Sequence, residues 1–193
     1  MTRIEYRDLS SRIPKEPFPA KPRILYTAGT TYSRIEEQPD PTRAIHGLII
    51  VNEPDVWMVN LLDRRAQHFV DRGPTFVVHH NVLPRHTSPN EFAPLEFGKE
   101  LDFFRSKKAK TLPLKSVDGQ RCKPFELRHY AYRLVLYVRT DKSIPFQLEI
   151  FKDEKNIISV RYMSYQTGLP FNQALFKPPP DVAITEGKAN SVQ

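Results

Sequence analysis

The segment from residue 132 to residue 163 constrains the fold of this chain most strongly. Apolar and polar residues alternate over 132–139, over 146–150 and again over 158–163, and short polar turns separate the three runs. Alternation with a period of two is typical of β-strands that bury one face. Short strands joined by polar turns favour an antiparallel sheet in which neighbours along the chain pair with each other.

The rest of the chain predicts a meander of the same kind. Further strand-like runs cover residues 23–26, 32–37, 46–52, 56–62, 67–71, 111–116 and 123–128. The run VWMVNLL at 56–62 carries apolar residues on both of its faces. This pattern is typical of a strand that is covered on both sides, and we therefore expect helices over its second face.

Helices are expected to be few and short. The chain contains 18 prolines against 7 glycines, and proline disfavours the interior of helices. The best helix candidate covers residues 90–108, where Asn90 can cap the first turn. Its apolar stripe would comprise Phe97, Leu101 and Phe104. A short helix over residues 1–13 and an extended proline strap over residues 14–22 complete an α+β prediction.

Length and charge indicate an ordinary globular protein. A chain of 193 residues suits one domain and can bury a sizeable core without disulfides. The net charge of +7 comes from lysines and arginines spread along the sequence, so we interpret the loosely basic stretch at 107–123 as a solvated face and expect no nucleic acid.

No apolar run approaches the length of a membrane helix. The amino terminus has no apolar signal core, so we expect either a cytoplasmic protein or one from which a leader has been removed.

No pattern of residues names a reaction. Three histidines lie close together in the sequence HHNVLPRH, namely His79, His80 and His86. Their spacing matches no standard zinc motif, so we interpret them as loop histidines. Cys122 cannot form an intrachain disulfide because it is the only cysteine. Its flanking Arg121 and Lys123 would favour a reactive thiolate, but nothing supports a catalytic triad. We predict no catalytic residue, no metal and no cofactor.

The closing segment, residues 146–182, carries the one family resemblance of the chain. A strand ending in PFQLEIF leads through the polar turn DEKN into a strand that ends in VRYMSY. The short helical segment LPFNQALF and the proline stop KPPPDV follow. Together with the meander HGLIIVNEPDVWMVNLLD, this order resembles the LolA-like superfamily of periplasmic lipoprotein carriers.

The resemblance implies a definite architecture. It implies a curved antiparallel sheet, an incomplete β-barrel, with helices packed on the concave side around an apolar hollow. The domain would cover residues 23–182, preceded by a helix and proline strap at 1–22 and followed by a flexible tail at 183–193. The sequence departs from the family in having no amino-terminal lipid-bearing cysteine, and the gating arginine of the carriers matches no position here.

The same resemblance implies a non-catalytic binding protein of the cell envelope. Its ligand would be a lipid or the acyl chain of a lipoprotein, held in a hydrophobic cavity. Partners would be lipids, acylated proteins or other envelope proteins, with contact at a membrane surface, and the location would be periplasmic after removal of a signal peptide, with anchoring left open. The cavity candidates are Trp57, Val59, Leu61, Phe69, Phe76, Phe97, Leu101, Phe104, Leu134, Leu136, Phe146, Leu148 and Tyr162.

Two alternatives stay open at this point. The first is a structural or interaction protein of the cell envelope whose core is completely filled by side chains. The second is a metal-dependent or thiol-dependent enzyme that uses the histidines at 79–86 or Cys122.

Overall fold

The computed structural model of the chain describes residues 1–9, 21–74, 76–83 and 89–187. This part is mostly β, with thirteen strands and one α-helix. Its contacts divide it into two compact units, which are described separately below. Unit 1 contains residues 1–3, 22–74, 76–79 and 166–187. Unit 2 contains residues 4–9, 21, 80–83 and 89–165.

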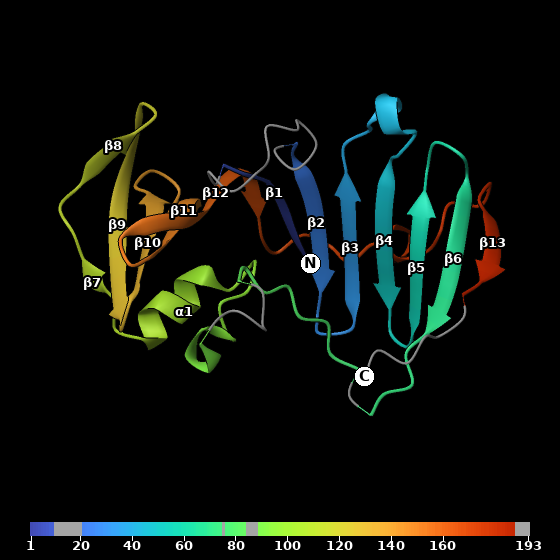
Figure 1. Cartoon of the computed structure of the whole chain (residues 1–193), viewed down its shortest axis with the longest axis horizontal. Helices are drawn as coiled ribbons and strands as arrows, with labels where there is room; N and C mark the ends of the chain where they lie inside the picture. Colours follow the sequence, from blue (N-terminus) through green and yellow to red (C-terminus); the bar gives the residue numbers. More distant parts are fainter. Residues whose placement is uncertain (10–20, 75, 84–88, 188–193) are drawn as a thin grey trace. The chain divides into compact units, whose positions relative to one another are not determined.

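Unit 1 is a meander with the strand order β13-β6-β5-β4-β3-β2 (Figure 1). Successive strands from β2 to β6 pair antiparallel, whereas β13 pairs parallel with β6 at the edge. The strands are β2 (Arg23–Ala28), β3 (Tyr32–Glu37), β4 (Gly47–Asn52), β5 (Asp55–Asn60), β6 (Arg65–Val70) and β13 (Ala183–Glu186). Two short 3-10 helices join them, η1 (Pro41–Arg43) and η4 (Gln173–Phe176).

The core of unit 1 lies on one face of this meander. Leu48, Ile50 and Val59 are buried there together with Phe176, which η4 brings onto the sheet. Asn172 starts η4 because its side-chain oxygen accepts a hydrogen bond from the Ala174 amide at 3.1 Å. The closing segment of the chain thus covers this face of the sheet.

The opposite face of unit 1 differs from the expectation for the run at 56–62. Ile49 and Met58 are cross-strand partners on that face, and they remain 40% and 51% exposed. No helix of the described residues covers them. The prediction of cover on both sides was therefore wrong for this face, which leaves apolar side chains in contact with solvent.

Unit 2 contains most of β1 and has the strand order β1-β12-β11-β10-β9-β7, with β8 also paired to β9 (Figure 1). Strands β9 to β12 pair antiparallel in sequence order. The strands are β1 (Thr2–Asp8), β7 (Lys110–Thr111), β8 (Lys115–Val117), β9 (Gln120–His129), β10 (Tyr132–Arg139), β11 (Pro145–Lys152) and β12 (Lys155–Gln166). Its helical elements are η3 (Asn90–Phe92) and α1 (Glu100–Ser106).

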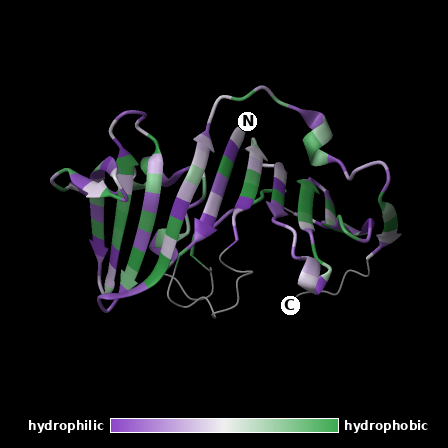
Figure 2. Ribbon diagram, turned by 90° about the horizontal axis from the view of Figure 1, so that it is seen from above, coloured by the Kyte–Doolittle hydropathy of each residue, from purple (hydrophilic) through white to green (hydrophobic). Residues whose placement is uncertain are grey.

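The core of unit 2 uses the alternation that the sequence predicted. Leu134 and Leu148 are fully buried on one face of the sheet, and the alternating bands of hydropathy along the strands show this pattern in Figure 2. Phe92 of η3 packs its ring against Tyr132 of β10 and Phe103 of α1. The two helical elements therefore pack against this face of the sheet.

The helical predictions need correction. The helix expected over 90–108 is reduced to η3 and α1, because Pro94 has no amide hydrogen to donate and Gly98 adopts a φ of +92°. The helix expected over 1–13 is absent from its described part, residues 1–9, where β1 forms instead and buries Ile4. None of the described helices has the length and hydropathy needed to cross a membrane.

The fold class also needs correction. The described part is mostly β and not α+β, and its strand order ends in free edge strands, β13 in unit 1 and β7 in unit 2. The strongly curved, incomplete barrel with several helices is not observed. Residues 14–20 of the predicted strap, His86 and the tail beyond residue 187 lie outside the described residues.

Candidate ligand-binding groove

An apolar groove of about 340 Å³ lies on the open face of unit 1, over β3, β4 and β5. Ile35 stands opposite Ile49 across the β3–β4 pair, and Ile49 stands opposite Met58 across the β4–β5 pair. Cross-strand partners share a face of the sheet, so these three side chains form one apolar row. The full lining comprises Ile35, Glu37, Ile45, Gly47, Leu48, Ile49, Met58, Val59 and Asn60.

Gly47 leaves space at one end of the groove. It occupies the same face of β4 as Ile49, two residues away, and has no side chain to place there. A Cβ atom at this position would lie 3.1 Å from the Glu37 Oε2 atom and meet nothing else closely except the rest of that flexible side chain. A larger residue at this position would therefore project into the groove.

Asn60 holds the wall that contains Ile45. Its Oδ1 atom accepts hydrogen bonds from the amides of His46 at 2.9 Å and Leu62 at 3.2 Å. Its Nδ2 atom donates to the carbonyl oxygen of Ala44 at 2.9 Å. These three bonds fix the backbone on both sides of Ile45 against the end of β5.

A hollow of about 480 Å³ with both polar and apolar side chains in its lining adjoins the groove on the same unit. The two share Met58 and Asn60 in their linings. The hollow extends over β6 and β13, where Arg65, Gln67 and Thr185 contribute to its lining. An apolar row next to a hollow with charged side chains, Asp63 and Arg65, is suited to an amphiphile, a molecule with an apolar chain and a polar head.

The residues predicted for a ligand cavity lie in several places. Val59 is the one that lines the groove. Trp57 and Leu61 pack against the core of unit 1, Phe69 contacts Gly187, and Phe76 is exposed. Those in the core of unit 2 are Phe97, Leu101, Phe104, Leu134, Leu136, Leu148 and Tyr162, all of them buried or half-buried. Phe146 packs beneath the guanidinium of Arg161.

Sequence reasoning missed the residues that form most of the groove. Ile35, Ile45 and Ile49 were not singled out, and Met58 was expected to be covered. The usable signal was the doubly apolar run at 56–62, which was interpreted as a sign of helices. A strand with apolar residues on both faces has the same sequence whether its second face is covered or open to solvent. The local sequence determines which residues share a face, but it does not show which element packs on that face.

The candidates for metal and thiol chemistry are not assembled into a site. Cys122 is completely buried, and burial raises the pKa of its thiol despite the opposing charges of Arg139 and Arg161. His79 is exposed and His80 half-buried. Among the described residues, no three His, Cys, Asp or Glu side chains come together in a metal-binding cluster.

Unit 2 contains one fully buried carboxyl group, that of Glu100 at the start of α1. It accepts hydrogen bonds from the hydroxyl of Tyr162 at 2.9 Å, the hydroxyl of Tyr165 at 2.8 Å and the Gly98 amide at 3.0 Å. Burial raises the pKa of Glu100, although the three donors oppose this effect. The group ties α1 to β12 and lines none of the grooves described for this chain.

Comparison with known proteins yields structural likenesses only. No family model matches the sequence, and no curated protein matches it. The structure is similar to that of an uncharacterized conserved protein from Thermus thermophilus, at 7% identity over 96% of this chain and 90% of that chain, with a TM-score of 0.49. It is also similar to MucB, solved in complex with MucA(peri), at 9% identity over 95% of this chain and 54% of that one, with a TM-score of 0.43.

A further likeness is to PNGF-II, at 11% identity and a TM-score of 0.37, over 97% of this chain and 31% of that chain. This chain thus spans about half of the MucB chain and about a third of the PNGF-II chain. Scores at this level establish no family membership. The resemblance of the closing segment to the LolA-like superfamily therefore stays a prediction.

Proposed function

We propose that this protein is a non-catalytic binding protein that holds an amphiphilic ligand, such as a fatty acid or a lipid acyl chain, in the groove of unit 1. The observation that carries the proposal is the row of exposed apolar side chains over β3, β4 and β5. Ile49 and Met58 contact solvent in the centre of a groove of about 340 Å³, a volume in the range of small-molecule sites.

Burial of methylenes supplies the affinity. Each buried methylene contributes about 0.8 kcal/mol, so a chain that buries about eight of them gains about 6 kcal/mol. This gain corresponds to a dissociation constant between millimolar and micromolar. Such affinity suits a protein that takes up a lipid and releases it again.

The neighbouring hollow supports one orientation of the ligand. With the apolar chain against Ile49 and Met58, the head group would lie over β6, near Arg65 and Gln67. A carboxylate there gains a charge-assisted interaction with the guanidinium of Arg65, which outweighs the repulsion from Asp63 if the head group lies closer to Arg65. We therefore propose that fatty acids bind more tightly than alcohols of the same chain length.

The place of the protein in the cell is part of the proposal. The closing segment resembles periplasmic lipoprotein carriers, and this resemblance supports a periplasmic location with lipids or acylated proteins as partners. The groove supports the same class of ligand through its chemistry.

A fluorescent palmitate analogue provides the test, titrated into the wild type, Met58→Glu and Met163→Glu. Met163 is a matched control because it is 53% exposed, close to the 51% of Met58, and belongs to β12 of unit 2, which contributes no residue to the lining of the groove. We expect saturable binding by the wild type and Met163→Glu, and at least a tenfold weaker affinity for Met58→Glu, whose carboxylate must be desolvated by the acyl chain. Absence of saturable binding by the wild type, or equal binding by all three, would refute the proposal.

A further inference from the structure

A separate polar pocket lies on unit 2, and none of its lining residues also lines the apolar groove of unit 1. Its volume is about 440 Å³. It lies on the face of the sheet opposite the core, because Arg161 of β12 stands across from Gln147 of β11, and Gln147 stands across from Tyr137 of β10. The lining comprises Leu9, Lys115, Ser116, Val117, Asp118, Tyr137, Gln147, Glu149 and Arg161.

Arg161 is the centre of this pocket. Its side chain is only 10% exposed, and its guanidinium lies 4.4 Å from the centroid of the Phe146 ring. Its Nε atom donates to the Gln147 Oε1 atom at 3.1 Å, and Nη2 donates to the same oxygen. Phe146 and Gln147 thus hold the guanidinium in place independently of any anion.

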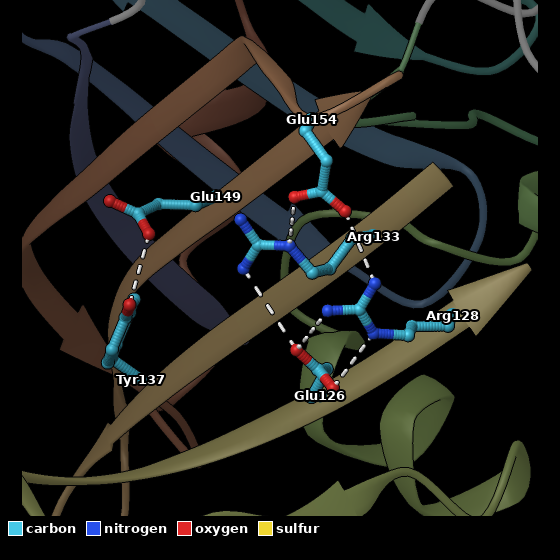
Figure 3. Close-up of polar contacts among 6 residues, drawn as sticks. All are labelled: Glu126, Arg128, Arg133, Tyr137, Glu149 and Glu154. Atoms are coloured by element: carbon cyan, nitrogen blue, oxygen red, sulfur yellow. Dashed lines mark hydrogen bonds and ion pairs between the residues drawn. The ribbon is translucent and has the colours of Figure 1, made fainter. Parts of the chain in front are cut away.

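Among the contacts of the described residues, no hydrogen bond or ion pair joins the Glu149 carboxylate to Arg161; its donors are two neutral groups. The hydroxyl of Tyr137 donates to its Oε2 atom at 3.0 Å (Figure 3), and the Gln147 Nε2 atom donates to its Oε1 atom at 2.7 Å. Burial, followed by the charge of Glu149, raises the pKa of Tyr137 to about 12, so this donor stays protonated at physiological pH. Each oxygen of Glu149 thus accepts one hydrogen bond from a neutral donor.

The anion that neutralises Arg161 is Asp118, a weakly held residue. Its Oδ2 atom accepts a hydrogen bond from the Arg161 Nη2 atom at 2.6 Å, but its side chain is 71% exposed. Asp118 and Gly119 form the two-residue turn between β8 and β9 and have positive φ angles of +46° and +76°, as Asp-Gly pairs in tight hairpin turns commonly do. Because Asp118 is exposed while the guanidinium of Arg161 is buried, Asp118 can leave at low cost only when another anion takes its place on Arg161.

Two other arginines of the sheet, Arg128 and Arg133, are paired differently. Arg128 and Arg133 share Glu154, with distances of 3.2 Å and 3.1 Å to its two oxygens, and both also approach Glu126 (Figure 3). Glu126 and Glu154 each pair with both arginines, so the loss of either carboxylate would remove an ion pair from Arg128 and from Arg133 at once. Arg161 has a single exposed carboxylate that can be exchanged; Arg139 is paired in the same way with Asp141 but does not line the pocket.

We propose that this pocket binds a small molecule through its carboxylate group, which takes the place of Asp118 on Arg161. The planar guanidinium matches a carboxylate with two parallel hydrogen bonds. Lys115 adds a second cation at the rim, with its ammonium 5.6 Å from the centroid of the Tyr137 ring. The apolar side chains of Leu9 and Val117 offer contact for the body of the ligand.

Charge balance favours a monoanion over a phosphate. Exchange of one carboxylate for another leaves the charge around the buried guanidinium unchanged. A phosphate dianion would bring additional negative charge toward Glu149, which the pocket already contains. The site is independent of the apolar groove, since no residue lines both.

Benzoate is a suitable probe because it combines a carboxylate with a small apolar body. We would follow the Nε–H signal of Arg161 by NMR during titrations with benzoate, with benzamide as the neutral analogue, with phosphate, and with chloride at matched ionic strength. We expect a saturable response to benzoate alone. A response to chloride or benzamide equal to that of benzoate, or tighter binding of phosphate, would overturn the proposal.

Two variants of one ion pair should act in opposite directions. Asp118→Asn removes the competing anion and should tighten benzoate binding about tenfold, whereas Arg161→Gln should abolish it. Asp141→Asn is the matched control, because Asp141 accepts a 2.6 Å hydrogen bond from Arg139 outside the pocket lining. Unchanged or weaker benzoate binding by Asp118→Asn would overturn the exchange, and this outcome can be measured even if Arg161→Gln fails to fold.

Discussion

At the scale of single residues, Glu100 shows what a local pattern can and cannot predict. Phe104 was predicted correctly as an inward-facing residue of α1. Glu100 lies in the first turn of α1, where a local pattern indicates only that an acidic side chain complements the helix dipole. Its burial depends on Tyr162, which lies 62 residues further along the chain. A pattern of neighbouring residues in the sequence cannot identify a partner this far away. Only the folded structure shows that the carboxyl group of Glu100 is buried against Tyr162.

The raised pKa of Glu100 predicts how stability depends on pH. A carboxyl group whose pKa is higher in the folded than in the unfolded state binds more protons when folded, so it destabilises the protein as pH rises through that range. Glu100→Gln removes this titration while keeping the shape of the side chain. We expect the variant to gain stability relative to the wild type between pH 4 and pH 7, as measured by urea unfolding.

A variant at an exposed position of the same helix separates this effect from a general change in charge. Asp102 is exposed on α1 and pairs with Arg105. Asp102→Asn should leave the pH dependence of unfolding close to that of the wild type. If Glu100→Gln and the wild type keep the same difference in stability at both pH values, Glu100 does not titrate as argued.

At the scale of elements, the strands were predicted well and their long-range partners were not. Strands β3 and β10 have the predicted bounds within one residue, because alternation and turns are local. Strand β13 was predicted as part of a flexible tail. It has no buried residue, and its parallel pairing with β6 depends on a segment more than a hundred residues away.

His68 of β6 is expected to make the docking of β13 depend on pH. Its Nε2 atom lies 2.8 Å from Asp55 and its Nδ1 atom 3.1 Å from Glu186 of β13. These two carboxylates raise the pKa of His68. The protonated form therefore stabilises β13 at low pH, and this contribution is lost as pH rises through the raised pKa.

Amide hydrogen exchange measures this effect directly. After correction for intrinsic rates, the amides at 184–186 should exchange faster at pH 8 than at pH 6 in the wild type. His68→Gln should remove the difference, whereas His46→Gln should not, because His46 contacts Glu36 and not β13. Equal protection at both pH values in the wild type would show that β13 is held by its backbone hydrogen bonds alone.

At the scale of the whole molecule, the chain divides its binding surfaces between its two units. The sequence predicted one hollow lined by residues from 57 to 162, whereas the apolar groove lies on unit 1 and the polar pocket on unit 2. Periodicity identifies the face that a side chain occupies, but not which faces meet. For this reason the predicted cavity residues are distributed over two cores.

Because the two sites share no lining residue, their binding reactions should be independent. The effects of substitutions at well-separated sites normally add within about 0.5 kcal/mol. We therefore expect Met58→Glu to weaken the palmitate analogue without changing the affinity for benzoate, and Asp118→Asn to have the reverse selectivity. Titration of each probe in the presence of saturating amounts of the other should give unchanged dissociation constants. A more than threefold shift in either dissociation constant would show that binding at one site changes the free energy of binding at the other. The two sites would then be energetically coupled.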